Sequence, residues 1–152
     1  MVLQSVAGTT VGEDADDLQA WIRVLAGCPH VTHTMLTRCD NPTHGEDERP
    51  SWFYVEGDPR HGVARRRCLS CAVVKPMLDS NDHWTFPPMW MCRGCGQSIA
   101  EIGIGAHAET TGDGPRVTWI VIGLRCVGCG TVDGLTDMLV PHLTLGEVAR
   151  QI

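Results

Sequence analysis

The fold is decided by residues 92–130, which read CRGCGQSIAEIGIGAHAETTGDGPRVTWIVIGLRCVGCG. A Cys-x-x-Cys-Gly unit opens this stretch at Cys92, and a second unit begins at Cys126 near its end. Between the two units, apolar residues dominate the runs 99–110 and 117–125, and the turn sequence TGDGP separates these runs. The pattern predicts a β-hairpin that brings the two cysteine pairs side by side.

The two cysteine pairs have the spacing of metal ligands. Two residues between paired cysteines let both sulfurs bind one ion at about 2.3 Å, and a following glycine tolerates a turn with positive φ. The chain has eight cysteines in 152 residues and shows no export signal, so we expect reduced thiols that bind metal. Residues 90–132 resemble a generic zinc ribbon, with one zinc ion bound by Cys92, Cys95, Cys126 and Cys129. Four thiolates leave no position for a substrate or water, so this ion is expected to be structural.

A second set of candidate ligands precedes the hairpin. Cys39 and His44 form a Cys-x4-His pair, and Cys68 and Cys71 form a Cys-x2-Cys pair. Three thiolates and one imidazole complete a tetrahedral zinc site, again without an open position. The sequence therefore predicts two structural zinc ions per chain.

Residues 39–71 resemble the Cys-His-Cys-Cys zinc ribbon of bacterial primases. In that family, a Pro-Ser-Phe-x-Val motif lies between the two ligand pairs. Pro50 and Ser51 match this motif directly, Trp52 stands in the place of the phenylalanine, and Tyr54 stands in the place of the valine. The resemblance implies the same ligand set and a single-strand-binding ancestry, in which the sheet of the ribbon contacts the template.

The chain also departs from the primase pattern. Four residues separate Cys39 from His44, where the family has two. Ser70 stands between the last two ligands, where the family has glycine. No catalytic primase domain fits in the remaining chain, so the resemblance supports the ligand set more than the activity.

The pairing of the ligand pairs has an alternative. Cys68 and Cys71 could share an ion with Cys92 and Cys95, because that interval also lies within common zinc-site spacing. The other ion would then be bound by Cys39, His44, Cys126 and Cys129. We favour the sequential arrangement, because each ion is then spanned by its own strands. A thioredoxin-like role for Cys92 and Cys95 is disfavoured, since a strand rather than a helix is expected to follow them.

Cys28 is left over in this scheme. We expect it to be a small buried residue, and the alternative is that it replaces His44 as the fourth ligand. His30 and His33 are weaker candidates for that position.

The chain before Cys28 is expected to form an arm or an edge strand over residues 1–12 and a helix over 13–27. Its apolar residues recur at helical spacing and form one face, made of Leu18, Trp21, Ile22 and Leu25. This face must pack against the body of the protein. The run 117–124 is apolar on both faces, so we also expect that strand to be buried on both sides.

Other segments predict strands at 51–55 and 62–68 and short helices after Asp133 and Thr144. Leu145, Val148 and Ile152 lie at helical spacing in the tail and predict a helix that docks on a partner.

The predicted fold is small α+β and mostly β, with an N-terminal helix packed on two tandem zinc ribbons and a short C-terminal helix. We expect one compact unit whose parts are the arm and helix at 1–27, the first ribbon at 28–89, the second ribbon at 90–135 and the C-terminal helical tail at 136–152.

The charge balance disfavours a general nucleic-acid coat. Twelve basic residues face 18 acidic ones, for a net charge of −6, and zinc makes the chain more negative because its thiolate ligands outweigh its charge. No run approaches the roughly 20 apolar residues of a membrane helix, so we expect a soluble, cytoplasmic protein.

One stretch is locally basic. It contains Arg60, Arg65, Arg66 and Arg67. Strand alternation would place Arg65 and Arg67 on one face and Arg66 on the other. The nearby aromatic residues Trp52 and Tyr54 could stack on bases, so all six residues are candidate contacts for nucleic acid or another partner. The alternative is that the aromatic residues are core and the arginines pair with neighbouring carboxylates.

The sequence contains no recognisable catalytic set, so we expect a protein that is not an enzyme and has no small-molecule substrate. The favoured function is an adaptor that docks on a protein or nucleoprotein complex such as a ribosome, polymerase or phage assembly. One alternative is a direct binder of single-stranded nucleic acid of the primase-ribbon type. Another is a zinc-responsive regulatory factor, whose folding follows the zinc supply.

Overall fold

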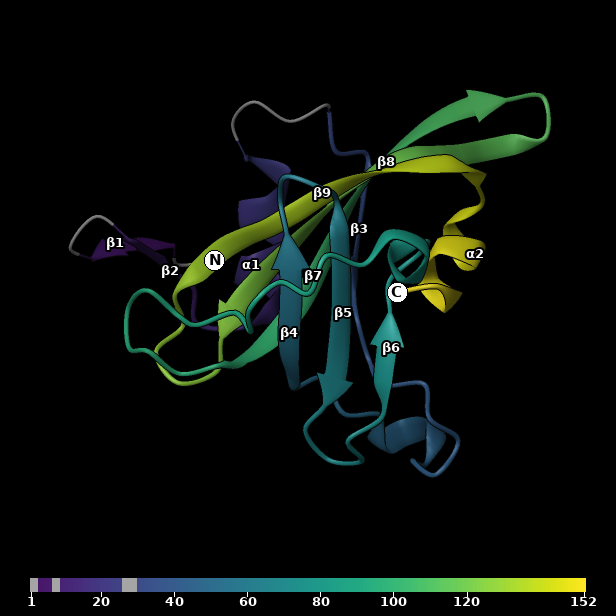
Figure 1. The fold of residues 1–152 in the computed structure, drawn as a ribbon. Helices are drawn as coiled ribbons and strands as arrows, with labels where there is room; N and C mark the ends of the chain where they lie inside the picture. The colour runs from purple at the N-terminus through teal and green to yellow at the C-terminus, as the bar shows by residue number, and fades with distance from the viewer. Residues whose placement is uncertain (1–2, 7–8, 26–29) are drawn as a thin grey trace.

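The elements of the fold are mostly strands, as expected. The computed structural model describes residues 3–6, 9–25 and 30–152 (Figure 1). Within them lie strands β1 (Gln4–Val6), β2 (Thr9–Val11), β3 (His33–Leu36), β4 (Phe53–Asp58), β5 (Val63–Cys68), β6 (Val74–Pro76), β7 (Ile99–Thr111), β8 (Gly114–Cys126) and β9 (Val132–Leu143). The helices are α1 (Ala15–Arg23), α2 (Leu145–Arg150) and the short 3-10 helices η1 (Glu46–Glu48) and η2 (Ser80–His83). Neither α-helix in the described part of the chain is long and apolar enough to cross a lipid bilayer.

Seven of the described strands form one antiparallel sheet in the order β6-β5-β4-β7-β8-β9, with β3 also paired to β7. The first residues of β4 pair with the start of β7, where Phe53 lies opposite Ala100. Strands from both expected ribbons therefore share a single sheet. The predicted small α+β fold, mostly β with antiparallel strands and a short C-terminal helix, is confirmed.

The long hairpin predicted from the sequence is present as β7 and β8. Its strands meet at a two-residue turn, because Thr111 pairs with Gly114, whose φ is +97°. The helix expected after Asp133 is wrong, since β9 occupies that segment and pairs with β8. The second edge of β8 needs partners for its N–H and C=O groups, and β9 supplies them.

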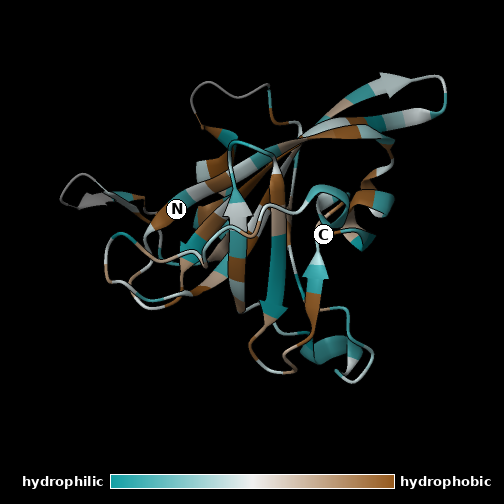
Figure 2. Ribbon diagram, viewed as in Figure 1, coloured by the Kyte–Doolittle hydropathy of each residue, from teal (hydrophilic) through white to brown (hydrophobic). Residues whose placement is uncertain are grey.

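The strand β8 is buried on both faces, as predicted. On one face, Ile120, Ile122 and Leu124 belong to the main apolar core. On the other face, Trp119 and Val121 pack in a second core with α1 and part of β9. Figure 2 shows the hydrophobic stretches of the sheet where it meets α1. The two cores explain why this strand carries apolar residues at consecutive positions.

The helix α1 approaches the sheet closely because glycines lie beneath it. A Cβ atom on Gly103 would lie 2.7 Å from Ile22, one on Gly105 2.5 Å and one on Gly123 2.9 Å. Real Cβ atoms do not come this close to carbon, so the absence of side chains at these positions makes the packing of α1 possible. The apolar face predicted for this helix is confirmed at Leu18 and Ile22, which are fully buried.

The C-terminal helix α2 covers the chain's own core. Thr144 caps it, and a capping box joins Thr144 to Glu147. Val148 and Ile152 are buried in the main core, and Leu145 packs against it. The predicted partner-docking role of this apolar face is therefore wrong, because the face is already covered within the molecule.

Candidate metal centres

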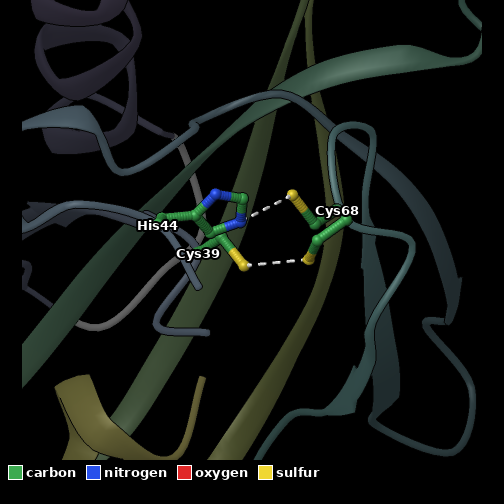
Figure 3. A group of neighbouring side chains, drawn as sticks. Cys39, His44 and Cys68 are labelled. Carbon is green, nitrogen blue, oxygen red and sulfur yellow. Dashed lines mark hydrogen bonds between the residues drawn. The ribbon is translucent and has the colours of Figure 1, made fainter. Parts of the chain in front are cut away.

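The first metal centre joins two loops at one end of the sheet. Cys39 follows β3, and His44 lies just before η1. Cys68 is the last residue of β5, and Cys71 lies in the loop after it. Their ligand atoms all lie within 4.8 Å of one another. The Cys39 and Cys71 sulfurs are 3.7 Å apart, and the Cys68 sulfur is 3.8 Å from Nε2 of His44. Figure 3 shows the imidazole of His44 directed toward the sulfur of Cys68, with the sulfur of Cys39 beside them.

The second metal centre lies where the long hairpin begins and ends. Cys92 and Cys95 precede β7. Cys126 is the last residue of β8, and Cys129 follows that strand. All four sulfurs lie within 4.8 Å of one another. The Cys92–Cys129 and Cys95–Cys126 sulfur pairs are each 3.5 Å apart. Cys92 and Cys126 are buried, whereas Cys95 and Cys129 are exposed.

These distances fit tetrahedral zinc. Four sulfurs at about 2.3 Å from one ion lie roughly 3.8 Å apart, and an imidazole nitrogen lies slightly closer to its neighbours. A disulfide would require about 2.05 Å, and each of the seven cysteines in the described part of the chain is free. Each of the two clusters among the described residues therefore fits one zinc ion.

Local turns hold the ligands in place. At the second centre, the glycine after each cysteine pair has positive φ, +78° at Gly96 and +81° at Gly130, as the spacing predicted. The N–H of Gly94 donates to the Cys92 sulfur at 3.3 Å, and Thr131 Oγ1 lies 3.1 Å from the Cys129 sulfur. These contacts fix the direction of the sulfurs, so that they converge on one point.

Burial and hydrogen bonding shift the thiol pKa values in opposite directions. Burial raises the pKa of Cys126 to about 12. Burial also acts to raise the pKa of Cys129, but hydrogen bonds from the hydroxyl and N–H of Thr131 outweigh it and lower the pKa to about 6. At Cys71, burial is likewise outweighed, here by hydrogen bonds from Val73 and Asn41, and the pKa is lowered to about 6. One ligand of each cluster therefore favours the thiolate, which is the form that zinc binds.

The sequential pairing of half-sites is the one found in the structure. The alternative, in which Cys68 and Cys71 share an ion with the next cysteine pair, is wrong. His30 and His33 lie outside both clusters, and the ring of His33 is 2.9 Å from the hydroxyl of Thr32. Cys28 lies outside the described residues.

The arginine-rich stretch divides between core and surface. Arg65 binds both carboxylate oxygens of Glu56, at 2.9 and 3.1 Å, and its guanidinium lies 4.3 Å from the ring of Trp84. Arg67 is exposed and lies over Tyr54. Arg60 is exposed in the turn after β4. The predicted alternation is confirmed, with Arg66 on the opposite face from its neighbours.

Arg66 is not available as a surface contact. Its side chain is 1% exposed, and its guanidinium donates to the carbonyl of Ile152 at 3.0 Å and to Asp40 at 3.4 Å. It also lies 4.8 Å from the ring of Phe53. The expected contact with nucleic acid or a partner is corrected at this position, because the sheet turns this side chain into the core.

A shallow apolar pocket lies beside the first metal centre. It has a volume of about 370 Å³ and is lined by Arg49, Pro50, Ser51, Trp52, Leu69 and Ser70. Trp52 is 46% exposed and Leu69 is 39% exposed. Sequence reasoning singled out Trp52 but missed Leu69, whose place between two zinc ligands is the signal that it faces outward.

The clusters confirm the predicted zinc sites, while the likeness to primase ribbons stays a prediction. No known protein family, curated protein or solved structure matches the chain.

Proposed function

We propose that the chain is a non-enzymatic adaptor, in which two zinc ions hold the shape of a surface that binds a protein or nucleoprotein complex. The observation that carries the proposal is the closed ligand set of both clusters. Each ion would have four side-chain ligands and no position for a substrate. Recognition then falls to the side chains around the ions.

The exposed residues beside the first centre support this role. Trp52 and Leu69 present apolar surface to solvent at the metal-bound end of β4 and β5. Tryptophan in a pocket on a rigid scaffold is typical of the residues that dominate protein interfaces.

Binding of single-stranded nucleic acid is the second candidate function. Phe53 and Val55 are buried, so strand alternation turns Trp52 and Tyr54 to the outer face of β4, with Arg67 stacked on Tyr54. Aromatic residues on one strand face stack on successive bases at about 1–3 kcal/mol each. This function is the less favoured one, because Arg65 is paired with Glu56 and the chain is acidic.

The test is affinity capture of the tagged, zinc-loaded chain from its native cell, with native mass spectrometry of the eluate and a parallel nuclease-treated sample. We expect a protein partner that survives nuclease and a chain that carries two zinc ions. A partner lost on nuclease treatment would favour the second function. Metal-dependent turnover of a substrate by the purified chain would contradict both.

A further inference from the structure

We infer that the pocket formed by Trp52 and Leu69 receives a bulky apolar side chain from an extended peptide that carries an acidic residue beside it. The inference rests on the proposed adaptor function and names the chemistry of its partner. It follows from the shape, the rigidity and the charge of the pocket.

The shape of the pocket suits an apolar side chain. Trp52 and Leu69 both line the pocket, and their backbones are joined by a hydrogen bond of 3.0 Å from the N–H of Leu69 to the carbonyl of Trp52. Pro50 adds a further apolar wall. With about 370 Å³, the pocket has room for an aromatic or branched aliphatic side chain together with adjoining backbone. Burying such a side chain would remove the exposed surface of both Trp52 and Leu69 from water.

The pocket is held rigid by the first metal centre. Leu69 and Ser70 lie between the ligands Cys68 and Cys71, so the zinc knuckle fixes their backbone. The N–H of Cys39 also donates to the carbonyl of Pro50 at 2.8 Å, which ties this lining residue to a third ligand. A preformed pocket loses little conformational entropy on binding, and this favours recognition of a short peptide.

The charge beside the pocket calls for a carboxylate. Arg49 lines the pocket, and the guanidinium of Arg38 donates to the Arg49 carbonyl at 3.3 Å. Within the described parts of the chain, neither arginine forms an ion pair, whereas Arg65, Arg93 and Arg125 all do. The guanidinium of Arg49, which lines the apolar pocket without a carboxylate partner among the described residues, is complementary to an acidic residue adjacent to an apolar one.

The same surroundings disfavour a nucleic acid in this pocket. The three residues of η1, Glu46, Asp47 and Glu48, are exposed and come directly before Arg49. A phosphodiester backbone carries a charge at every nucleotide and would pass these carboxylates, whereas one acidic side chain can reach Arg49 alone. We therefore commit to a peptide and treat nucleic acid as an outcome of the test.

The test uses a phage-displayed library of random dodecapeptides, selected on the zinc-loaded full-length chain. We expect the selected peptides to share a large apolar residue with Asp or Glu within two positions. Synthetic peptides made from them should bind roughly tenfold or more weakly to Leu69→Gln and to Arg49→Gln, by fluorescence anisotropy. The matched controls are Leu139→Gln, at a leucine that is 84% exposed on β9, and Arg150→Gln on α2, and both should bind like the unchanged chain. Two zinc ions per chain by native mass spectrometry verify that each variant is folded.

Two results would overturn the inference. Selected peptides that bind Leu69→Gln and Arg49→Gln as tightly as the unchanged chain would place peptide binding elsewhere, and the adaptor function would survive. Failure to select any peptide, together with binding of a labelled oligo(dT) that Leu69→Gln weakens, would assign the pocket to nucleic acid and reject the peptide.

Discussion

The backbone N–H of Ala72 donates a hydrogen bond of 2.9 Å to the carbonyl of Cys68. The same bond, with the same length, is made by Gly96 and by Gly130 in the two knuckles of the second centre. All three donors have positive φ, which is +62° at Ala72. The knuckle therefore imposes a left-handed residue after its second cysteine, even where the chain supplies a Cβ atom.

We expect Ala72→Gly to stabilise the zinc-loaded protein by about 1 kcal/mol, because glycine adopts positive φ without steric cost. Urea unfolding would measure the change. The reverse substitution supplies the comparison. Gly96→Ala should cost a similar amount, since no atom lies within 4 Å of the added Cβ, whereas Gly130→Ala should cost more, because its Cβ would lie 2.5 Å from the carbonyl oxygen of Gly12. A destabilised Ala72→Gly would contradict this account of the knuckle.

The packing of α1 predicts a second effect. Gly105→Ala should destabilise the protein by about 1–3 kcal/mol, because the new methyl group would overlap Ile22. Gly103→Ala should also destabilise the protein, because its Cβ would lie 2.7 Å from Cδ1 of Ile22. Ile22→Val removes that atom and should recover part of this second loss, which a double-mutant cycle would show as coupling between positions 22 and 103. Gly134→Ala on β9 is the matched control, since nothing lies within 4 Å of that position. Equal effects at Gly105 and Gly134 would exclude close packing as the cause.

The two clusters predict the zinc content of variants. Cys39→Ser and Cys92→Ser should each leave one strongly bound zinc ion per chain by native mass spectrometry, because each removes a ligand from a different cluster. Cys28→Ser should retain two ions, because both four-ligand sets are complete without it. Chelation of both ions should unfold the metal-bound loops, since structural zinc contributes about 10–16 kcal/mol of apparent binding free energy in small zinc-finger peptides. Loss of an ion from Cys28→Ser would reopen the assignment of His44.

The neighbouring residues Arg66 and Arg67 should differ sharply in their effects on stability. Arg66→Ala removes a buried guanidinium that bridges Asp40 and the Ile152 carbonyl, and we expect a loss of about 2–4 kcal/mol. Arg67→Ala removes an exposed side chain and should change the free energy of unfolding by less than about 0.5 kcal/mol. Thermal or urea unfolding of the two zinc-loaded variants would make the comparison, and similar losses at both positions would contradict the burial of Arg66.

The capping box of α2 predicts a pH dependence. The carboxylate of Glu147 accepts the backbone N–H of Thr144 at 2.8 Å, and this bond lowers the pKa of Glu147 below its ordinary value of 4.5. Its contribution to stability is therefore present above pH 4.5 and is lost as the pH falls through the lowered folded pKa. The difference in unfolding free energy between the unchanged chain and Glu147→Gln should shrink over that interval. Because both proteins have the same metal sites, acid release of zinc cancels in the difference. If the difference in unfolding free energy stayed constant with pH, the capping bond of Glu147 would not be the source of the pH dependence.

Features that depend on short stretches of chain were predictable from the sequence. The ligand pairs, the hairpin strands and the apolar face of α1 all follow from the spacing of a few neighbouring residues. A Cys-x-x-Cys turn brings its sulfurs together through local backbone geometry alone, and a helix repeats its faces every 3.6 residues. These properties are independent of what the rest of the chain does.

Features that depend on contacts between distant residues were not predictable. The sequence predicts a short helix after Asp133 where β9 lies, because the need of β8 for a second partner is visible only in the assembled sheet. Arg66 and Ile152 are separated by 86 positions, and only their contact in the core shows that this arginine is buried and that the tail covers its own sheet. Local spacing predicts which face of an element is apolar, but contacts between distant residues decide which surface covers that face.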